Sequence, residues 1–303
     1  MLILHLVPVG RSLLIHLDQG TSPTLRSALA VDELPVDTVG EALRQATGQD
    51  HELDLQRLRL TGVPAAALAL DTGTAAEWTS VAAAQPRSGV VDGEAYLFIA
   101  TDTDDGLRAA VLLAARYQHP LRYLHEPLTA GDPEIEPGDV YLCRIPDLDL
   151  GSREPTGTTW RSLGTVGRLA AKTAAQTGRG DWQVIVHLSG GYKAMIPYLM
   201  VLAEGINSIF QDLHTRYPAT SYRPTIKAVA VHESSLDRVV PIPVRFIQDP
   251  LLAGARKLAE LTRPDSDIIR TDAADQLLGL FIERKGEGTR RLTEAGLIMV
   301  SLL

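Results

Sequence analysis

The sequence predicts an α/β protein with a mostly parallel central sheet and helices on both of its faces. Three observations lead to this prediction. Short runs rich in Val, Ile, Leu and Tyr are hydrophobic almost without interruption, as the strands of a buried parallel sheet should be. Helical patterns fall between several of these runs. Beyond residue 246 the pattern changes to helices and one charged hairpin. We therefore expect a Rossmann-like domain over residues 1–246 and a small helical or winged-helix-like unit over residues 249–303.

The elements follow from hydrophobic periodicity. The strand-like runs lie at residues 1–7, 94–101, 120–125, 139–145, 182–188, 225–232 and 239–246. The clearest helical patterns lie at residues 37–47, 104–117, 160–177 and 192–213. Residues 50–92 give no clear pattern and are consistent with a helical insertion. His5 and His187 fall inside predicted strands, and we expect both side chains in the core.

The C-terminal unit is predicted to begin with a helix at Asp249-Pro250 and to continue with a second helix from Asp272 to Glu283. A charged hairpin and a last helix follow, which resemble the wing and final helix of a winged-helix unit. Residues 249–303 hold 8 Lys and Arg against 9 Asp and Glu, which favours a connector or dimerisation role over DNA reading. The apolar stretch 297–303 is expected to pack in a dimer, or to precede a further domain.

Composition excludes several classes of protein. The chain has 303 residues, of which 45% are hydrophobic and 22% charged, as in a globular protein with a substantial core. The apolar N-terminus lacks a basic flank and a cleavage site, so it reads as a strand and not a signal peptide, and no apolar run is long enough to span a membrane. A net charge of −8 argues against broad, charge-driven binding to duplex DNA, but it is compatible with a small basic pocket for one compact anion.

The single cysteine, Cys143, cannot form an internal disulfide, which suits a reducing cytoplasm. It lies in a predicted strand, where we expect it to be inert. One cysteine also leaves too few soft ligands for a zinc site, and nothing in the sequence calls for a metal or a cofactor.

Three predicted strands end in polar, glycine-containing loops. These loops are Gly10-Arg11-Ser12, Thr101-Asp102-Thr103 and Ser189-Gly190-Gly191-Tyr192-Lys193. In an open parallel sheet, ligands bind beyond the carboxyl ends of the strands. If the three strands are parallel neighbours, the three loops converge on one ligand.

The chemistry of these loops suits a phosphate-containing ligand. Glycines let the backbone approach a phosphate closely, a helix N-terminus favours an anion, and Lys193 adds a positive charge. Ser12, Thr101 and Ser189 offer hydroxyls. Neither the Walker A pattern nor G-x-G-x-x-G is present. Ordinary turn chemistry is the competing interpretation, and Thr103 or Asp104 would then simply cap the helix predicted at 104–117.

Taken in order, the three loops resemble those of the CRISPR-associated Rossmann-fold (CARF) family. Gly10-Arg11-Ser12-Leu13-Leu14 matches a G-x-S-L-L turn after the first strand. Thr101-Asp102-Thr103-Asp104-Asp105-Gly106 matches an S/T-[DE]-T-x-x-G motif in mid-domain. Ser189-Gly190-Gly191-Tyr192-Lys193 matches [ST]-G-G-[FY]-K, and Pro197 follows in the next helix. The resemblance covers roughly residues 1–246.

The resemblance implies a homodimer that binds cyclic oligoadenylate, the second messenger of type III CRISPR systems, in a pocket across the dimer axis. Cyclic tetra-adenylate is the favoured ligand. The ligand-binding positions it implies are Gly10, Arg11, Ser12, Thr101, Asp102, Thr103, Ser189, Gly190, Gly191, Tyr192 and Lys193.

Three roles remain open within this family. The chain is a sensor that activates an effector not contained in it, a ring nuclease, or a CARF-controlled transcriptional regulator. A ring nuclease would cleave without metal, leaving a 2′,3′-cyclic phosphate, with Ser12 orienting the attack and Lys193 stabilising the charge. A HEPN ribonuclease is excluded from residues 249–303, which contain no histidine. A nucleotide-binding enzyme of unrelated class is the alternative outside the family.

Overall fold

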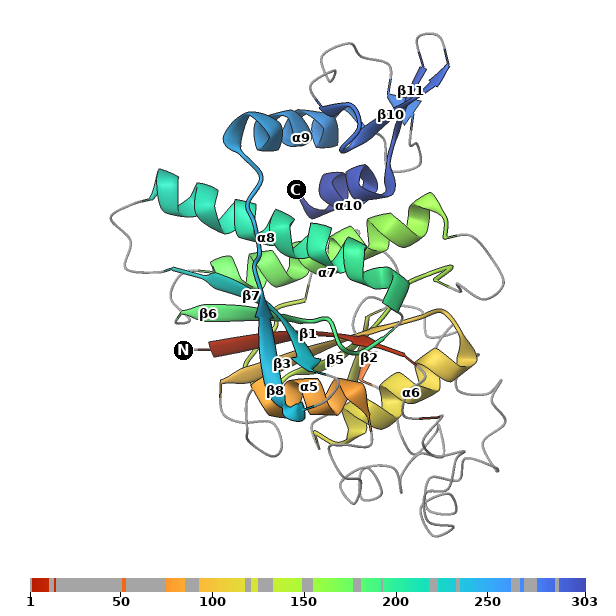
Figure 1. Ribbon diagram of the computed structural model, residues 1–303, viewed down its shortest axis with the longest axis vertical. Coiled ribbons are helices and arrows are strands. Elements are labelled where there is room, and N and C mark those ends of the chain that lie inside the picture. The colour runs from red at the N-terminus through yellow and green to blue at the C-terminus, as the bar shows by residue number, and fades with distance from the viewer. Residues whose placement is uncertain are drawn as a thin grey trace.

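The computed structural model describes the following residues: 2–10, 14, 51–52, 75–84, 93–117, 121–124, 133–148, 155–176, 181–191, 193–217, 223–232, 235–262, 268–269, 277–286 and 289–303. Within them, an eight-stranded sheet has the order β2-β4-β5-β3-β1-β6-β7-β8 (Figure 1). Its strands are β1 (Leu2–Val9), β2 (His51–Glu52), β3 (Glu94–Ala100), β4 (Leu121–Leu124), β5 (Val140–Arg144), β6 (Trp182–His187), β7 (Thr225–His232) and β8 (Ser235–Ile242).

The six strands from β4 to β7 in this order pair in parallel, and only the two edge strands, β2 and β8, pair antiparallel to their neighbours. Every residue of β3 and β6 is buried, which explains why both strands are mostly hydrophobic. At the β8 edge, Pro241 lies opposite Val229 of β7. The predicted parallel sheet is confirmed.

Helices cover both faces of this sheet, as predicted. On one face lie α5 (Ala76–Ala84) and α6 (Asp104–Ala115), and on the other lie α7 (Gly157–Ala175) and α8 (Ile196–Arg216) (Figure 1). The helix α5 falls in the segment 50–92 that gave no clear sequence pattern. The helix predicted at 37–47 lies outside the described residues.

Pro197 lies in the first turn of α8, where a proline does not disrupt a helix. A 3₁₀ turn, η2, covers Lys193–Met195 and leads directly into α8, whose second residue is Pro197. Proline is tolerated there because the first amides of a helix have no intrahelical partner. The predicted helix at 192–213 therefore forms, with Lys193 in its opening turn.

The C-terminal unit forms a third layer on top of α7 and α8 (Figure 1). It contains α9 (Asp249–Leu261), a small antiparallel sheet of order β10-β11-β9, and α10 (Glu294–Leu302). The strands of this sheet are β9 (Ile268–Ile269), β10 (Ile282–Gly286) and β11 (Thr289–Leu292). The apolar stretch 297–303, expected to pack in a dimer or to precede another domain, packs within the same chain, because α10 lies on α7, α8 and α9.

Three glycines allow α10 to approach α7 and α8 closely. A Cβ on Gly164 of α7 would lie 2.3 Å from the Ile298 carbonyl oxygen, and one on Gly205 of α8 would lie 2.3 Å from Leu302 Cδ2. A Cβ on Gly167 would lie 2.2 Å from Leu202 and 3.1 Å from Leu302. The buried side chains of α7, α8, α9 and α10 consequently belong to one hydrophobic cluster.

Two sequence predictions about elements are wrong. The second C-terminal helix, predicted from Asp272 to Glu283, is absent over the described residues 277–283, which form a turn and the start of β10. The cause is Gly279, whose φ of +82° and N–H bond to the Ile282 carbonyl reverse the chain. The strand predicted at 239–246 is β8, at 235–242; beyond it, residues 243–248 leave the sheet.

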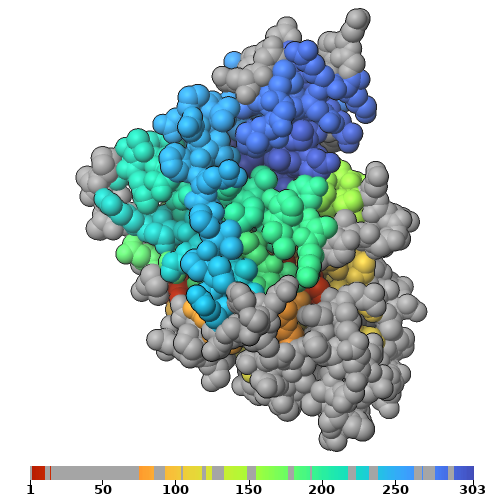
Figure 2. Space-filling view, in the orientation of Figure 1, coloured from red at the N-terminus to blue at the C-terminus, as the bar shows by residue number. Residues whose placement is uncertain are grey.

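Residues 243–248 form a connector that runs from β8 across the outer surface of α8 to α9 (Figures 1 and 2). Side chains of α8 hold it in place. Asn207 Nδ2 donates to the carbonyls of Val244 and Arg245, and the Ile247 N–H donates to Ser208 Oγ. Glu204 binds the Arg245 guanidinium at 2.8 Å.

Candidate functional site

The loops that follow β1 and β6 are in direct contact. These strands are parallel neighbours, so Gly10 and Ser189–Gly191 emerge at the same edge of the sheet. A Cβ on Gly10 would lie 2.9 Å from the backbone of Gly191. Gly191 itself has a φ of +77°, a conformation that favours glycine. The glycines at both positions are thus required by the close approach of the two loops.

A buried glutamate joins these two loops. Glu77 Oε1, from the first turn of α5, accepts hydrogen bonds from the Gly10 N–H at 2.9 Å and from the Gly191 N–H at 3.1 Å. The residue is only 1% exposed. A Cβ on Gly190 would lie 2.6 Å from Glu77 Cγ and 2.6 Å from the Pro8 carbonyl oxygen. We call Gly10, Gly190 and Gly191 the glycine cradle, which Glu77 closes from the side of α5.

The role of Glu77 was not predicted from the sequence, and it changes the expected role of the glycines. We expected their amides to face a phosphate, whereas those of Gly10 and Gly191 bind a carboxylate of the protein. Glu77 lies in the stretch 50–92, where no motif or periodicity distinguishes it from a surface glutamate. No signal in a single sequence would have identified it.

Lys193 lies directly after the cradle loop, in the opening turn of η2, and its side chain is exposed. It makes no ion pair with a carboxylate of any described residue. Its predicted contact with an anionic ligand stays a prediction.

Ser189, predicted to offer its hydroxyl to a ligand, has a structural partner. Its Oγ accepts a short hydrogen bond from the Val231 N–H of β7. This bond fixes the start of the cradle loop to the neighbouring strand.

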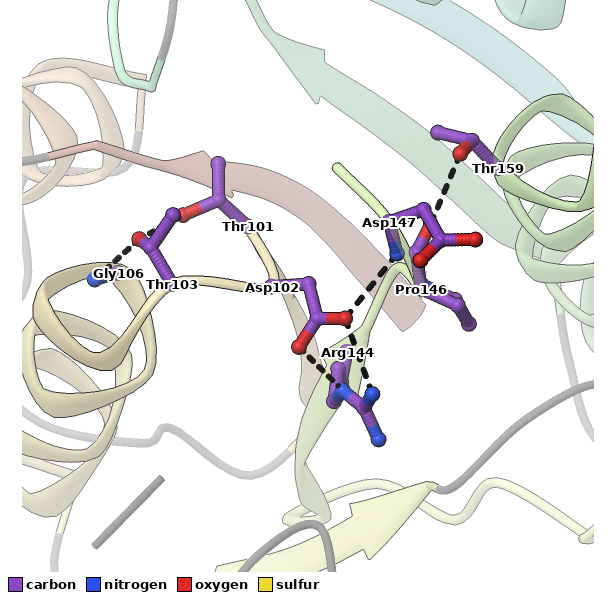
Figure 3. Close-up of polar contacts among 8 residues, drawn as sticks. All are labelled: Thr101, Asp102, Thr103, Gly106, Arg144, Pro146, Asp147 and Thr159. Atoms are coloured by element: carbon purple, nitrogen blue, oxygen red, sulfur yellow. Dashed lines mark hydrogen bonds and ion pairs between the residues drawn. The ribbon is translucent and has the colours of Figure 1, made fainter. Parts of the chain in front are cut away.

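The Thr101–Thr103 loop follows β3, which lies beside β1 on the side opposite to β6. The side chains of Thr101 and Thr103 lie at the start of α6 (Figure 3). Thr103 Oγ1 accepts from the Gly106 N–H at 3.0 Å and so caps α6, which confirms the predicted N-cap. Thr101 Oγ1 lies 3.0 Å from Thr103 Oγ1. A Cβ on Gly106 would fall 1.8 Å from Thr101 Oγ1, so only glycine leaves room for this arrangement.

Asp102 turns toward the loop after β5 (Figure 3). Its carboxylate accepts two hydrogen bonds from Arg144, at 2.8 and 3.0 Å, and a third from the Asp147 N–H. Both side chains of this ion pair are nearly buried. Thr159 of α7 donates to the Pro146 carbonyl in the same loop. Asp102 therefore organises the edge of the sheet, and none of the bonds described for it runs to the glycine cradle.

A chain of buried polar side chains lies beneath the cradle. Ser80 Oγ is 2.7 Å from His187 Nδ1, and His187 Nε2 is 2.9 Å from His5 Nδ1. Burial lowers the pKa of His187 to about 3, and burial together with the neighbouring His187 lowers the pKa of His5 well below its usual range. Both histidines are fully buried and neutral, as the strand alternation predicted.

Three predicted site residues, Arg11, Ser12 and Tyr192, lie outside the described residues.

Cys143 is buried, and burial raises the pKa of its thiol. In the part of the chain that the structure describes, no group of three or more His, Cys, Asp or Glu side chains is placed to hold a metal ion. None of the described helices is long and apolar enough to cross a membrane.

No protein-family model matches the chain, and no curated protein matches its sequence.

Proposed function

We propose that this chain is a homodimeric CARF-type sensor in the cytoplasm that binds cyclic oligoadenylate in type III CRISPR defence. Cyclic tetra-adenylate is the ligand we favour. The observation that carries the proposal is the meeting of the β1 and β6 loops at one edge of the sheet, with the exposed Lys193 beside them.

The topology supports a ligand at this place. The four strands that follow β1 in the chain, β2 to β5, all lie on one side of β1 in the sheet. The next strand, β6, lies on the other side of β1. The order of strands thus reverses beside β1, and ligands of open α/β sheets bind at such a reversal, outside the carboxyl ends of the strands. The glycine cradle lies between β1 and β6 at this point.

The charge at the edge supports an anionic ligand. The cradle amides of Gly10 and Gly191 are engaged by Glu77, so Lys193 supplies the positive charge that a phosphodiester requires. In a two-fold dimer, each ring would meet two such lysines, related by the same symmetry as the ring.

Two observations favour a sensor over a transcriptional regulator. The helix predicted at 272–283 is absent over residues 277–283, and α10 is buried against α7 and α8. Neither segment therefore presents a free helix to DNA. Ring cleavage in the same pocket is the alternative that the experiment below separates from sensing.

The test is to mix the protein with labelled cyclic tri-, tetra- and hexa-adenylate in the absence of metal. Gel shift measures binding, and chromatography over an hour identifies products. We expect binding of the intact tetra-adenylate ring. Linear products ending in a 2′,3′-cyclic phosphate would instead identify a ring nuclease, and no binding to any ring would refute the proposal.

Replacing the cradle-side lysine tests the pocket itself. Lys193→Ala should weaken ring binding about tenfold or more, because a hydrogen bond to a charged group contributes about 1.5–3 kcal/mol. Lys257→Ala is the matched control, since Lys257 is also exposed but lies on α9. Equal affinities of the two variants would remove Lys193 from the site.

A further inference from the structure

We propose that Glu77 is a specificity-determining residue: its carboxylate occupies the cradle amides and excludes terminal phosphate groups from them. The inference rests on the proposed function and adds a selection rule to it. The cradle accepts the ring and rejects linear oligoadenylates that end in a phosphate monoester.

The first step is competition for the same two hydrogens. A phosphate bound by the Gly10 and Gly191 amides would need to place an oxygen where Glu77 Oε1 lies, at 2.9 and 3.1 Å from the two nitrogens. The two acceptors cannot occupy this position together. A ligand therefore meets a cradle whose two inward donors are already engaged.

The second step is charge. A terminal phosphate monoester carries a charge of about −1.5 to −2 at neutral pH, whereas each phosphodiester of a ring carries about −1. Glu77 adds a like charge within hydrogen-bond distance of the cradle, and like charges disfavour binding most strongly where water is excluded. The penalty thus falls mainly on the monoester.

The third step is that Glu77 is fixed in place. Its Cγ packs where a Cβ of Gly190 would otherwise lie, and α5 is held at further points along its length. Ser80 contacts His187 of β6, and Trp78 Nε1 donates to the Leu113 carbonyl of α6. These contacts hold the backbone of α5 against the sheet, so that the Glu77 carboxylate, itself 1% exposed, is presented to the two cradle amides.

The principal test compares the ring with linear tetra-adenylate bearing a 5′-phosphate. Glu77→Gln keeps one oxygen acceptor for both amides, removes the charge and replaces the second carboxylate oxygen with an NH2 group. We expect the preference of the protein for the ring over the linear molecule to fall about tenfold in this variant. Glu283→Gln is the control, because Glu283 is exposed on β10 and its loss changes the net charge equally. A preference unchanged by Glu77→Gln would overturn the proposal.

A second test needs no oligoadenylate. Glu77→Ala frees both amides and leaves space for a small anion. Millimolar inorganic phosphate or formate should then raise the melting temperature of Glu77→Ala, and leave those of the unmodified protein and Glu77→Gln unchanged. Equal responses of all three proteins would show that the cradle is not an anion site and would overturn the inference.

The two tests separate the two proposals. If no ring binds the unmodified protein but phosphate selectively stabilises Glu77→Ala, then the proposed function fails while the role of Glu77 as an internal anion stands. If rings bind and the selectivity does not depend on Glu77, the proposed function stands and this inference fails.

Discussion

The glycines at the carboxyl edge of the sheet show that a sequence motif can predict where a loop lies without predicting what its backbone amides bind. The glycines of Ser189-Gly190-Gly191 are required by contacts with Pro8, Gly10 and Glu77, whether or not a ligand binds. The motif therefore predicted the position of the loop correctly but not the direction of its amides. Lys193 is exposed, and its predicted role in binding an anion stays a prediction.

Other site residues were predicted with mixed success for a similar reason. Thr103 was expected as a helix cap, because capping depends on neighbours within three residues. The partners of Asp102 and Ser189, Arg144 and Val231, lie 42 positions away in the chain. Such pairings depend on strand order, which a single sequence does not specify.

The buried histidine pair makes a prediction about acid stability. The folded protein keeps His5 and His187 neutral, with the pKa of His187 near 3, whereas unfolded histidines take up protons near pH 6.5. The unfolded state thus binds more protons below pH 6.5, so the free energy of unfolding should fall there. Each histidine contributes up to about 1.4 kcal/mol per pH unit, and nothing above pH 7.5.

Urea unfolding between pH 7.5 and pH 4.5 measures this slope. Carboxylates also titrate in this range, so the comparison with His187→Gln isolates the histidine contribution. Glutamine retains groups that can bond to Ser80 and His5. A slope identical in the two proteins would mean that His187 takes up a proton without unfolding.

Among the elements, the close packing of α7 against α10 can be tested directly. Gly164→Ala would place a Cβ 2.3 Å from the Ile298 carbonyl, which is backbone and cannot rotate away. We expect a loss of about 1–3 kcal/mol of unfolding free energy, the usual cost of overpacking.

Gly157→Ala, in the same helix, is the control for this prediction. Its Cβ would meet only Leu297 Cδ1 at 3.8 Å, an ordinary contact, so its stability should stay unchanged or rise by up to about 1 kcal/mol. Chemical denaturation of both variants measures the two changes in unfolding free energy. Similar losses in the two variants would show that the contact with α10 does not determine the cost, because alanine by itself favours the helix.

The elements that the sequence predicted well are the buried strands, since burial on both faces leaves an unmistakable run of apolar residues. Prediction failed where a local conformation overrides the pattern. Gly279 turns the chain inside a stretch whose residue pattern is helical. Pro241 lies within β8 and Pro243 follows its last residue, so the sequence does not mark the end of this strand. The short strands β2 and β9 carry too few residues to show any period.

At the scale of the whole molecule, the two predicted units share one hydrophobic cluster. Leu252, Phe281 and Met299 of the C-terminal unit belong to the same cluster as Leu163 and Leu202 beneath them. The connector is bonded to α8 along its length, and Asp212 of α8 binds Arg256 of α9. The second unit is thus built onto the first.

We therefore expect the two units to unfold together. Calorimetry should give a single transition whose calorimetric and van't Hoff enthalpies agree. Truncation after residue 248 should expose the apolar surfaces of α7 and α8 and cause aggregation or loss of cooperative melting. Two separated transitions in the full chain would show that the shared cluster does not couple the units.

The proline in β8 has a consequence for self-association. An edge strand presents backbone groups to which another chain can add, and natural proteins block such edges with proline, which has no N–H to donate. Pro241 lies within the strand that ends the sheet on this side, and Pro243 follows it immediately. The sheet is thereby protected from growing into a neighbouring molecule through β8. In the dimer that we propose, the two copies would therefore not pair through β8.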